Sequence, residues 1–558
     1  MPSTRTQEDK LPAGSAKRNG SERSDAIEVE ENIENRPSKR ARTEDPEQTS
    51  SNAVTAGPKD DAVVGSAEDD IIEDEAEDIA EDAKDQPRAA DLYLDTVNRA
   101  ALDFDFEKVC SVCVSNINVY GCLVCGKYFQ GRGPKSYAYA HSIHEDHHVF
   151  MNLETTKVYI LPDNYLVSDP SLSDIVAYLS PKFSTSDLKA LDQPSHPNKP
   201  AFDLSNGPYI PGFIGLNNIK RHDHINVIIH MLLHVPPLRD FLILYPESHT
   251  KQLSKKVKSG SAQEPQKFPE LVMRLSMLAR KLWSPSLFKA QVSPHEFLQE
   301  VNRASKSKWR LEEQGDPAEF LGWLLNRLHA DLGGTKKKGS SVIYTTFQGE
   351  LRMQTQHVIV RPEAGSKQKP QFDIDRDIKS TDSPFLYLAV DLPPPPLFQD
   401  SVEKNIIAQV SLASVLSKYD GLTTQETLGT LKRYKLLRLP PYVILHFKRF
   451  TKNNFVEEKN PTIINFPLRG MDFREYLDVP EGHPPTVYDL LSNVTHESVA
   501  GTTRDKVNTV WKIHLRAGGG GGDGEKWFEI QDLIVKEVRK EMIFLGETVL
   551  QVWQRRDS

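Results

Sequence analysis

The stretch Pro211-Gly-Phe-Ile-Gly-Leu-Asn-Asn-Ile-Lys-Arg-His-Asp-His-Ile-Asn226 decides how the larger part of this chain is interpreted. It is the first of several blocks that follow one another towards the C-terminus. The later blocks are Gln314–Leu328, Leu439–Phe450, Trp527–Asp532 and Val549–Arg556. Within the second block, leucines at positions 321, 324, 325 and 328 have helical spacing and predict an amphipathic helix. Within the third, Tyr442–Phe450 is short, aromatic and branched, which favours a strand.

Together these blocks resemble the ubiquitin-specific protease family, in order and without a gap in the first block. The first block matches the family's opening helix pattern, and the others match its Q-D-A-x-E-F helix and its later strands. The resemblance implies an α+β fold, a papain-like domain with fingers, palm and thumb. This domain should span residues 205–558, with the five glycines Gly518–Gly522 as a flexible hairpin loop.

The resemblance also implies that the catalytic centre is degenerate. Asp223 stands at the family's cysteine nucleophile, Val510 at its histidine base, and Gln531 at the aspartate that orients the base. A carboxylate is a poor nucleophile towards an amide, and cysteine isopeptidases need a thiolate and a base together. Asn218, at the oxyanion donor, and Asp532, beside Gln531, survive. We therefore expect no protease activity.

One alternative for this centre, with His514 as the base, fails on geometry. His514 lies four residues beyond Val510, or about 13 Å along a strand, and cannot reach the same point. Asp223 near a helix start has a structural interpretation instead, because a negative charge there contributes about 0.3–1 kcal/mol of stability.

Upstream of these blocks, all four cysteines lie within sixteen residues, as two C-x₂-C pairs, Cys110/Cys113 and Cys122/Cys125. A histidine run, His141 to His148, follows them. Such clustering in a reducing compartment indicates a tetrahedral zinc site rather than disulfides. Two of the cysteines and two of the histidines would complete such a site.

Residues 89–200 resemble the ubiquitin-protease-type zinc finger. The resemblance implies one complete Zn²⁺ site made by Cys122, Cys125, His141 and His147. It makes Cys110 and Cys113 a weaker half-site, because Tyr137 stands where a further histidine is expected. A tetrad of Cys110, Cys113, Cys125 and one histidine remains an alternative.

Some fingers of this family grip the free C-terminus of ubiquitin with an arginine and an aromatic cage. Here Gly126-Lys127 stands at the arginine-aromatic position, and lysine lacks the bidentate fork of arginine. We therefore expect a structural or protein-docking module more than a ubiquitin reader.

Composition completes the domain organisation. Residues 1–88 have few aromatics, and Asp60–Asp85 holds thirteen carboxylates against one lysine, which predicts a disordered tail. The basic cluster 36–42 is either a nuclear import signal or an incidental patch. The net charge of −9 gives no general case for nucleic-acid binding, and exposed lysines such as those at 336–338 are more often solvated than bound to RNA. No apolar run is long enough for a membrane span.

A zinc finger followed by a protease-like domain without its triad resembles the family of inactive splicing factors associated with the spliceosomal tri-snRNP. The resemblance, carried also by residues 122–133, 161–165 and 450–454, implies a nuclear, non-catalytic scaffold that stabilises the tri-snRNP before spliceosome activation. It implies contacts with large U5 scaffold and helicase proteins, and leaves direct contact with RNA open. The alternative is a pseudoenzyme that binds ubiquitin without cutting it.

Overall fold

The computed structural model describes residues 92–105, 107–191, 199–246, 269–310, 312–361, 371–374, 378–394, 407–427, 429–452, 457–478, 484–500, 507–518 and 525–556. The predicted tail, 1–88, with its basic cluster, and most of the glycine loop lie outside these residues. The fold is α+β, as the sequence predicts: a small module that carries all four cysteines, followed by a large mixed domain.

The small module is built on an antiparallel sheet in the order β2-β1-β3-β4-β5. Period-two alternation gives each face its own core: Tyr120, Phe150 and Tyr159 pack on one side, and Val119 and Met151 on the other. The strands are β1 (Val119–Cys122), β2 (Tyr128–Gln130), β3 (Val149–Asn152), β4 (Val158–Ile160) and β5 (Tyr165–Val167). The helices are η1 (Leu92–Thr96), η2 (Arg99–Ala101), α2 (Tyr137–His144), η3 (Pro170–Leu172), α3 (Ser173–Leu179) and α4 (Thr185–Leu191).

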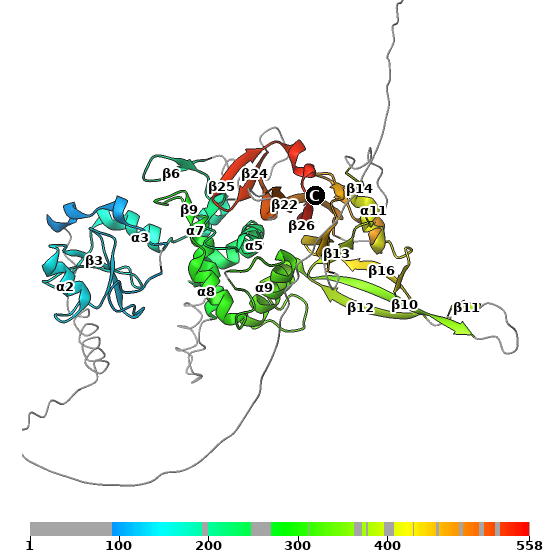
Figure 1. Cartoon of the computed structure of the whole chain (residues 1–558), viewed down its shortest axis with the longest axis horizontal. Helices are drawn as coiled ribbons and strands as arrows, with labels where there is room; N and C mark the ends of the chain where they lie inside the picture. The colour runs from blue at the N-terminus through cyan, green and yellow to red at the C-terminus, as the bar shows by residue number, and fades with distance from the viewer. Residues whose placement is uncertain are drawn as a thin grey trace, which may run out of the picture. The chain divides into compact units, whose positions relative to one another are not determined.

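Helices of the large domain lie together beside its main sheet (Figure 1). Every residue of α5 is buried, because this helix is enclosed by α9 and by the strands of the sheet. The predicted leucine helix is confirmed as α9, which starts after Asp316, whose side chain caps it by accepting from the Ala318 N–H at 2.8 Å. The helices are α5 (Asp223–Leu233), α7 (Glu270–Leu282), α8 (His295–Ala304), α9 (Pro317–Asp331) and α10 (Val342–Phe347).

The main sheet runs in the order β13-β17-β26-β22-β23-β24-β25, with β21 paired to β22. All neighbours are antiparallel except β13 and β17, and the predicted strand at 442–450 is confirmed as β17. The predicted hairpin around the glycine loop is confirmed as the β23–β24 pair. The strands are β13 (Leu388–Asp391), β17 (Tyr442–Lys448), β21 (Met471–Asp472), β22 (Val487–Ala500), β23 (Val507–Ala517), β24 (Lys526–Gln531), β25 (Ile534–Val538) and β26 (Thr548–Arg555).

A second sheet is formed mainly by the long strand β10 (Gly349–Arg361) with β12 (Lys379–Phe385) and β16 (Thr430–Arg438), which run side by side (Figure 1). Six of the seven side chains of β12 are exposed, so this sheet depends on its strand ladder more than on a core. Its other strands are β11 (Gln371–Ile374) and β15 (Gln425–Thr427).

Short pairs and turns complete the described domain. The pairs are β6 (Ala201–Phe202) with β7 (Pro208–Tyr209), β8 (Gly215–Leu216) with β9 (Gln291–Val292), β14 (Gln409–Ser411) with β20 (Ile463–Asn465), and β18 (Phe450–Lys452) with β19 (Glu457–Lys459). The short helices are α11 (Leu412–Leu416), η6 (Ser417–Tyr419), η7 (Arg474–Tyr476) and η8 (Lys540–Leu545).

No single helix of the described residues is long and apolar enough to cross a membrane. Only α5 together with the helix Pro236–Pro246 reaches the required length, across a bend of 93°.

Candidate metal centre and degenerate catalytic centre

One metal-binding cluster is present in the described part of the chain. Cys122, Cys125, His141 and His147 bring their ligand atoms within 4.8 Å of one another. Two sulfurs and two imidazole nitrogens are the donors of a structural zinc site, and the group could therefore hold Zn²⁺. These are the same four residues that the sequence resemblance singles out.

Local structure explains how this cluster is positioned. Cys122 ends β1, and its turn places Gly126 at φ +78°, with the Gly126 N–H donating to the Cys122 carbonyl at 2.9 Å. His141 lies on α2, and its ring stacks on Phe129 with 4.2 Å between centroids. The hydrogen bond between the two thiol groups lowers the pKa of Cys125 and raises the pKa of Cys122.

The first cysteine pair has the same backbone but different surroundings. Val114 follows Cys113 at φ +61°, and its N–H donates to the Cys110 carbonyl at 3.0 Å, as Gly126 does in the second pair. Cys113 lies 3.0 Å from Gln130 Oε1, and among the described residues no third histidine, cysteine or carboxylate joins the pair. Cys125 lies with Cys122, so the alternative tetrad is not the arrangement seen here.

Asp223, which the sequence resemblance assigns to the nucleophile position, is held in a buried hydrogen-bond network. Asp223, 5% exposed, is the first residue of α5. Gln314 Nε2 donates to both of its carboxylate oxygens, at 2.9 and 2.7 Å, and the Trp511 backbone N–H donates at 3.1 Å. Thr509 in turn donates its hydroxyl to Gln314 Oε1 at 2.5 Å. Burial raises the pKa of Asp223, against these hydrogen bonds, which lower it.

We name this network the Asp223 clamp: Asp223, Gln314, Thr509 and the Trp511 N–H. It joins α5, the start of α9 and β23, and Val510 lies in β23 between two of its members. In the sequence Gln314 stands out only as part of a block that resembles the family, and this role is not visible there. Nothing in local spacing could have revealed it, because the contacts span 91 to 288 residues.

No imidazole enters the clamp among the described residues. His222 directs Nε2 to the Asn217 carbonyl at 3.1 Å, and His224 lies among aromatic rings, where burial lowers its pKa to about 4. His514 lies 3.3 Å from Glu529 Oε2. The arrangement therefore places no base beside residue 223.

A second network holds the remaining candidate residues. Asn218 donates to Asp532 Oδ2 at 3.0 Å, and Asn226 donates to Asp532 Oδ1 at 2.9 Å. Asp532 turns in a left-handed conformation, at φ +49°, whereas Gln531 ends β24 opposite Ile534. Asp532, rather than its neighbour Gln531, thus contacts the segment before α5, and one amide hydrogen of Asn218 is already engaged.

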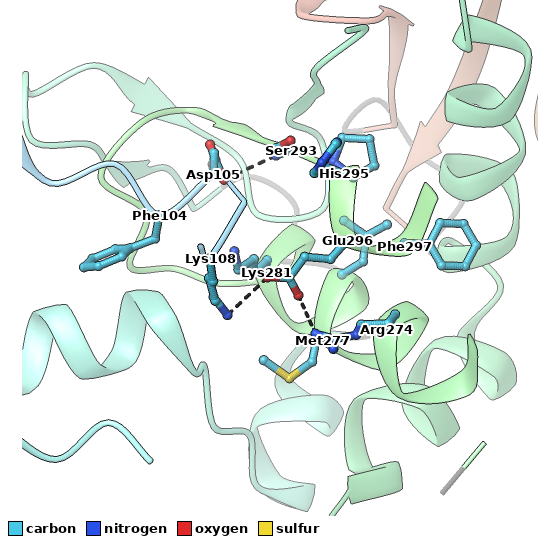
Figure 2. Close-up of a pocket in the computed structure, with 12 residues that line it drawn as sticks. Phe104, Asp105, Lys108, Arg274, Met277, Lys281, Ser293, His295, Glu296 and Phe297 are labelled. Carbon is cyan, nitrogen blue, oxygen red and sulfur yellow. Dashed lines mark hydrogen bonds and ion pairs between the residues drawn. The ribbon is translucent and has the colours of Figure 1, made fainter. Parts of the chain in front are cut away.

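A small pocket lies where residues 104–108 of the finger module meet α7 and α8 (Figure 2). Lys108 and Arg274 approach Glu296 from two sides, at 3.1 and 2.8 Å, and the Ser293 N–H donates to Asp105 at 3.4 Å. Burial opposes ionisation of Glu296, but the surrounding cations lower its pKa to about 2. Of these two ion pairs, Lys108–Glu296 links the finger module to the large domain, whereas Arg274–Glu296 lies within the large domain.

The lysines at 336–338, considered above as possible RNA contacts, are not part of any of these sites. Lys338 pairs with Glu350 at 2.5 Å, and Lys336 and Lys337 are exposed on a turn.

Comparison with known proteins agrees with this architecture. The family model "Ubiquitin carboxyl-terminal hydrolase" matches residues 214–553, and the model "Zn-finger in ubiquitin-hydrolases and other protein" matches residues 110–172. The fold and the two matches define a ubiquitin-hydrolase-type domain preceded by its zinc finger.

Individual relatives show which family within this class the chain resembles. The chain is 45% identical to the probable mRNA-splicing protein ubp10 of Schizosaccharomyces pombe, over 83% of this chain and 88% of that protein. It is 44% identical to ubiquitin carboxyl-terminal hydrolase 39 of Homo sapiens, over 84% and 80%. A solved structure described as an essential yeast splicing factor superposes with a TM-score of 0.62 at 28% identity, covering 83% of this chain and all of that one. The chain belongs to this family of splicing factors with a ubiquitin-hydrolase fold, and the homology supports a splicing role.

Proposed function

We propose that this chain is a non-catalytic assembly factor of pre-mRNA splicing that stabilises the tri-snRNP before spliceosome activation. The observation that carries the non-catalytic part is the Asp223 clamp. A group that must attack a carbonyl needs a free approach and a base, and Asp223 has its oxygens engaged by Gln314 and Trp511. The proposed role in splicing is supported by relatives whose names describe splicing proteins.

In this proposal Zn²⁺, held by Cys122, Cys125, His141 and His147, stabilises the finger and takes no part in chemistry. The partners are spliceosomal proteins, with the large U5 scaffold and helicase components as the expected ones, and the site of action is the nucleus. The ion pairs around Glu296 support the idea that finger and hydrolase-like domain present one joint surface to such partners.

Affinity purification of the tagged full-length chain from nuclear extract tests the splicing role. We expect the U4, U5 and U6 small RNAs to be enriched over a tag-only control, and the enrichment to survive substitution Asp223→Asn. Failure to recover these RNAs would contradict the assembly role.

A fluorogenic ubiquitin substrate tests the absence of catalysis on the same preparation. We expect no turnover above buffer. Turnover that is abolished by Asn218→Ala would overturn the non-catalytic assignment, and micromolar ubiquitin binding without recovery of snRNPs would favour the ubiquitin reader instead.

A further inference from the structure

An exposed apolar surface borders the degenerate centre. The turn after β24 lies on the segment before α5: the Leu216 N–H donates to the Asp532 carbonyl at 3.0 Å, and Asn218 reaches the Asp532 side chain. The residues that follow these contacts, Ile219, Leu533 and Ile534, are 47, 50 and 49% exposed. We name these three side chains the rim patch.

Cations flank the rim patch. Arg221 follows it on one side, and its side chain is exposed and makes no hydrogen bond or ion pair with the other described residues. On the other side Lys536, also exposed, shares a face of β25 with Ile534, because residues two apart point the same way. Lys220 lies next to Ile219 and pairs with the exposed Glu312. An exposed ion pair of this kind contributes little and exchanges readily.

The backbone next to the patch is also open. In the described residues β25 ends its sheet and has one strand neighbour, β24. The outer edge of such a strand offers unpaired N–H and C=O groups to an extended chain. A ligand that matches this surface combines aliphatic side chains with negative charge and can lie extended.

One segment of this chain has that composition. Asp69-Asp-Ile-Ile-Glu-Asp-Glu-Ala-Glu-Asp-Ile-Ala-Glu-Asp82 contains nine carboxylates, three isoleucines and no cation. Ile79 precedes Leu92, the first described residue, by thirteen residues, which can span up to about 45 Å. The finger is joined to the rim patch by a short series of contacts: Asp105 accepts from Ser293, and the Asn217 N–H donates to the Val292 carbonyl at 3.0 Å.

We propose that the segment Asp69–Asp82 docks on the rim patch, with its isoleucines against Ile219, Leu533 and Ile534 and its carboxylates on Arg221, Lys220 and Lys536. This inference goes beyond the proposed function and does not depend on which splicing partner the chain binds.

Zero-length carbodiimide coupling of the full-length chain tests the contact, because it joins a carboxylate to an amine only where the two touch. Mass spectrometry should find amide links from residues 69–82 to Lys220 or Lys536. The Lys526–Glu537 pair, at 2.8 Å, is the internal control for efficient coupling. Raising the ionic strength from about 0.1 to 1 M shortens screening from about 10 to 3 Å and should weaken the tail links.

Two surface variants separate docking from random encounter. Ile534→Asp adds a repelling charge to the patch and should reduce the tail links about five- to tenfold. Leu422→Asp, at an 81% exposed position elsewhere, should leave them unchanged. Links spread over lysines in proportion to exposure, or equal in both variants, would overturn the proposal. Links between two copies, recognised by mixing isotopically light and heavy chains, would overturn the assignment to the chain's own segment.

Discussion

Substitution Asp223→Ala tests the Asp223 clamp directly. It removes the acceptor for the Trp511 N–H and for one hydrogen of Gln314. Gln314 keeps the Thr509 carbonyl, at 3.2 Å, whereas the buried Trp511 N–H is left without an acceptor. An unsatisfied buried donor costs about 1–3 kcal/mol, and loss of the charge at the start of α5 adds about 0.3–1 kcal/mol.

One effect opposes this loss. Burial makes ionisation of Asp223 unfavourable, which is why its pKa is raised, and removal of the carboxylate relieves that cost. We therefore expect a net loss of about 2 kcal/mol in the free energy of unfolding near neutral pH.

The sign of the pH dependence follows from the raised pKa. A carboxyl whose pKa is higher in the folded chain contributes most below its ordinary value and loses this contribution as pH rises through the folded value. The difference between wild type and Asp223→Ala should therefore be larger near pH 5 than near pH 7.

Urea unfolding followed by tryptophan fluorescence is the measurement, since the six tryptophans, Trp511 among them, report on unfolding of the chain. Glu319→Ala is the matched control, because Glu319 also lies in the first turn of a helix but is exposed, and its loss should change stability by less than about 0.5 kcal/mol. The reasoning is refuted if Asp223→Ala unfolds at the wild-type urea concentration at both pH values.

Three other outcomes are expected. Cys122→Ser and His147→Ala should each lose bound zinc, measured by atomic absorption, while Cys113→Ser retains one zinc per chain; two zinc ions per wild-type chain would contradict a single site. Glu296→Gln should destabilise the chain by about 2 kcal/mol at neutral pH. Because the pKa of Glu296 is lowered to about 2, the difference in stability between wild type and variant should shrink in thermal melts as pH falls from about 4.5 towards 2. A difference that stays constant with pH would point to lost packing instead. Asp223→Cys alone should not turn over a fluorogenic ubiquitin substrate, because no imidazole contacts position 223 among the described residues, and measurable turnover would reveal a base elsewhere.

Local patterns predicted the elements of the fold well. The leucine spacing predicts α9 and the branched run predicts β17, because the periodicity of buried residues can be read from residues that are neighbours in the sequence. The four-residue metal cluster also follows from short spacings within one small module. Each of these depends on residues that are close in sequence.

Such local patterns do not predict contacts between residues that are far apart in the sequence. The partner of Asp223 is Gln314, ninety-one residues away, and only the packing of α9 beside α5 brings them together. The resemblance assigns the orienting position to Gln531, and in the structure a left-handed turn at Asp532 directs the neighbouring carboxylate to Asn218 and Asn226. A one-residue turn of this kind changes which side chain reaches a site without changing the alignment.

The clamp gives the aspartate at the nucleophile position a function of its own. A thiol is a weak acceptor and could not satisfy both the Trp511 N–H and the Gln314 amide as a carboxylate does. Because Gln314 and Thr509 hold the carboxylate of Asp223, replacing this residue by cysteine would cost stability. The site would still lack a base beside the cysteine. Asp223 is therefore a structural group in this fold, and it joins α5 to β23.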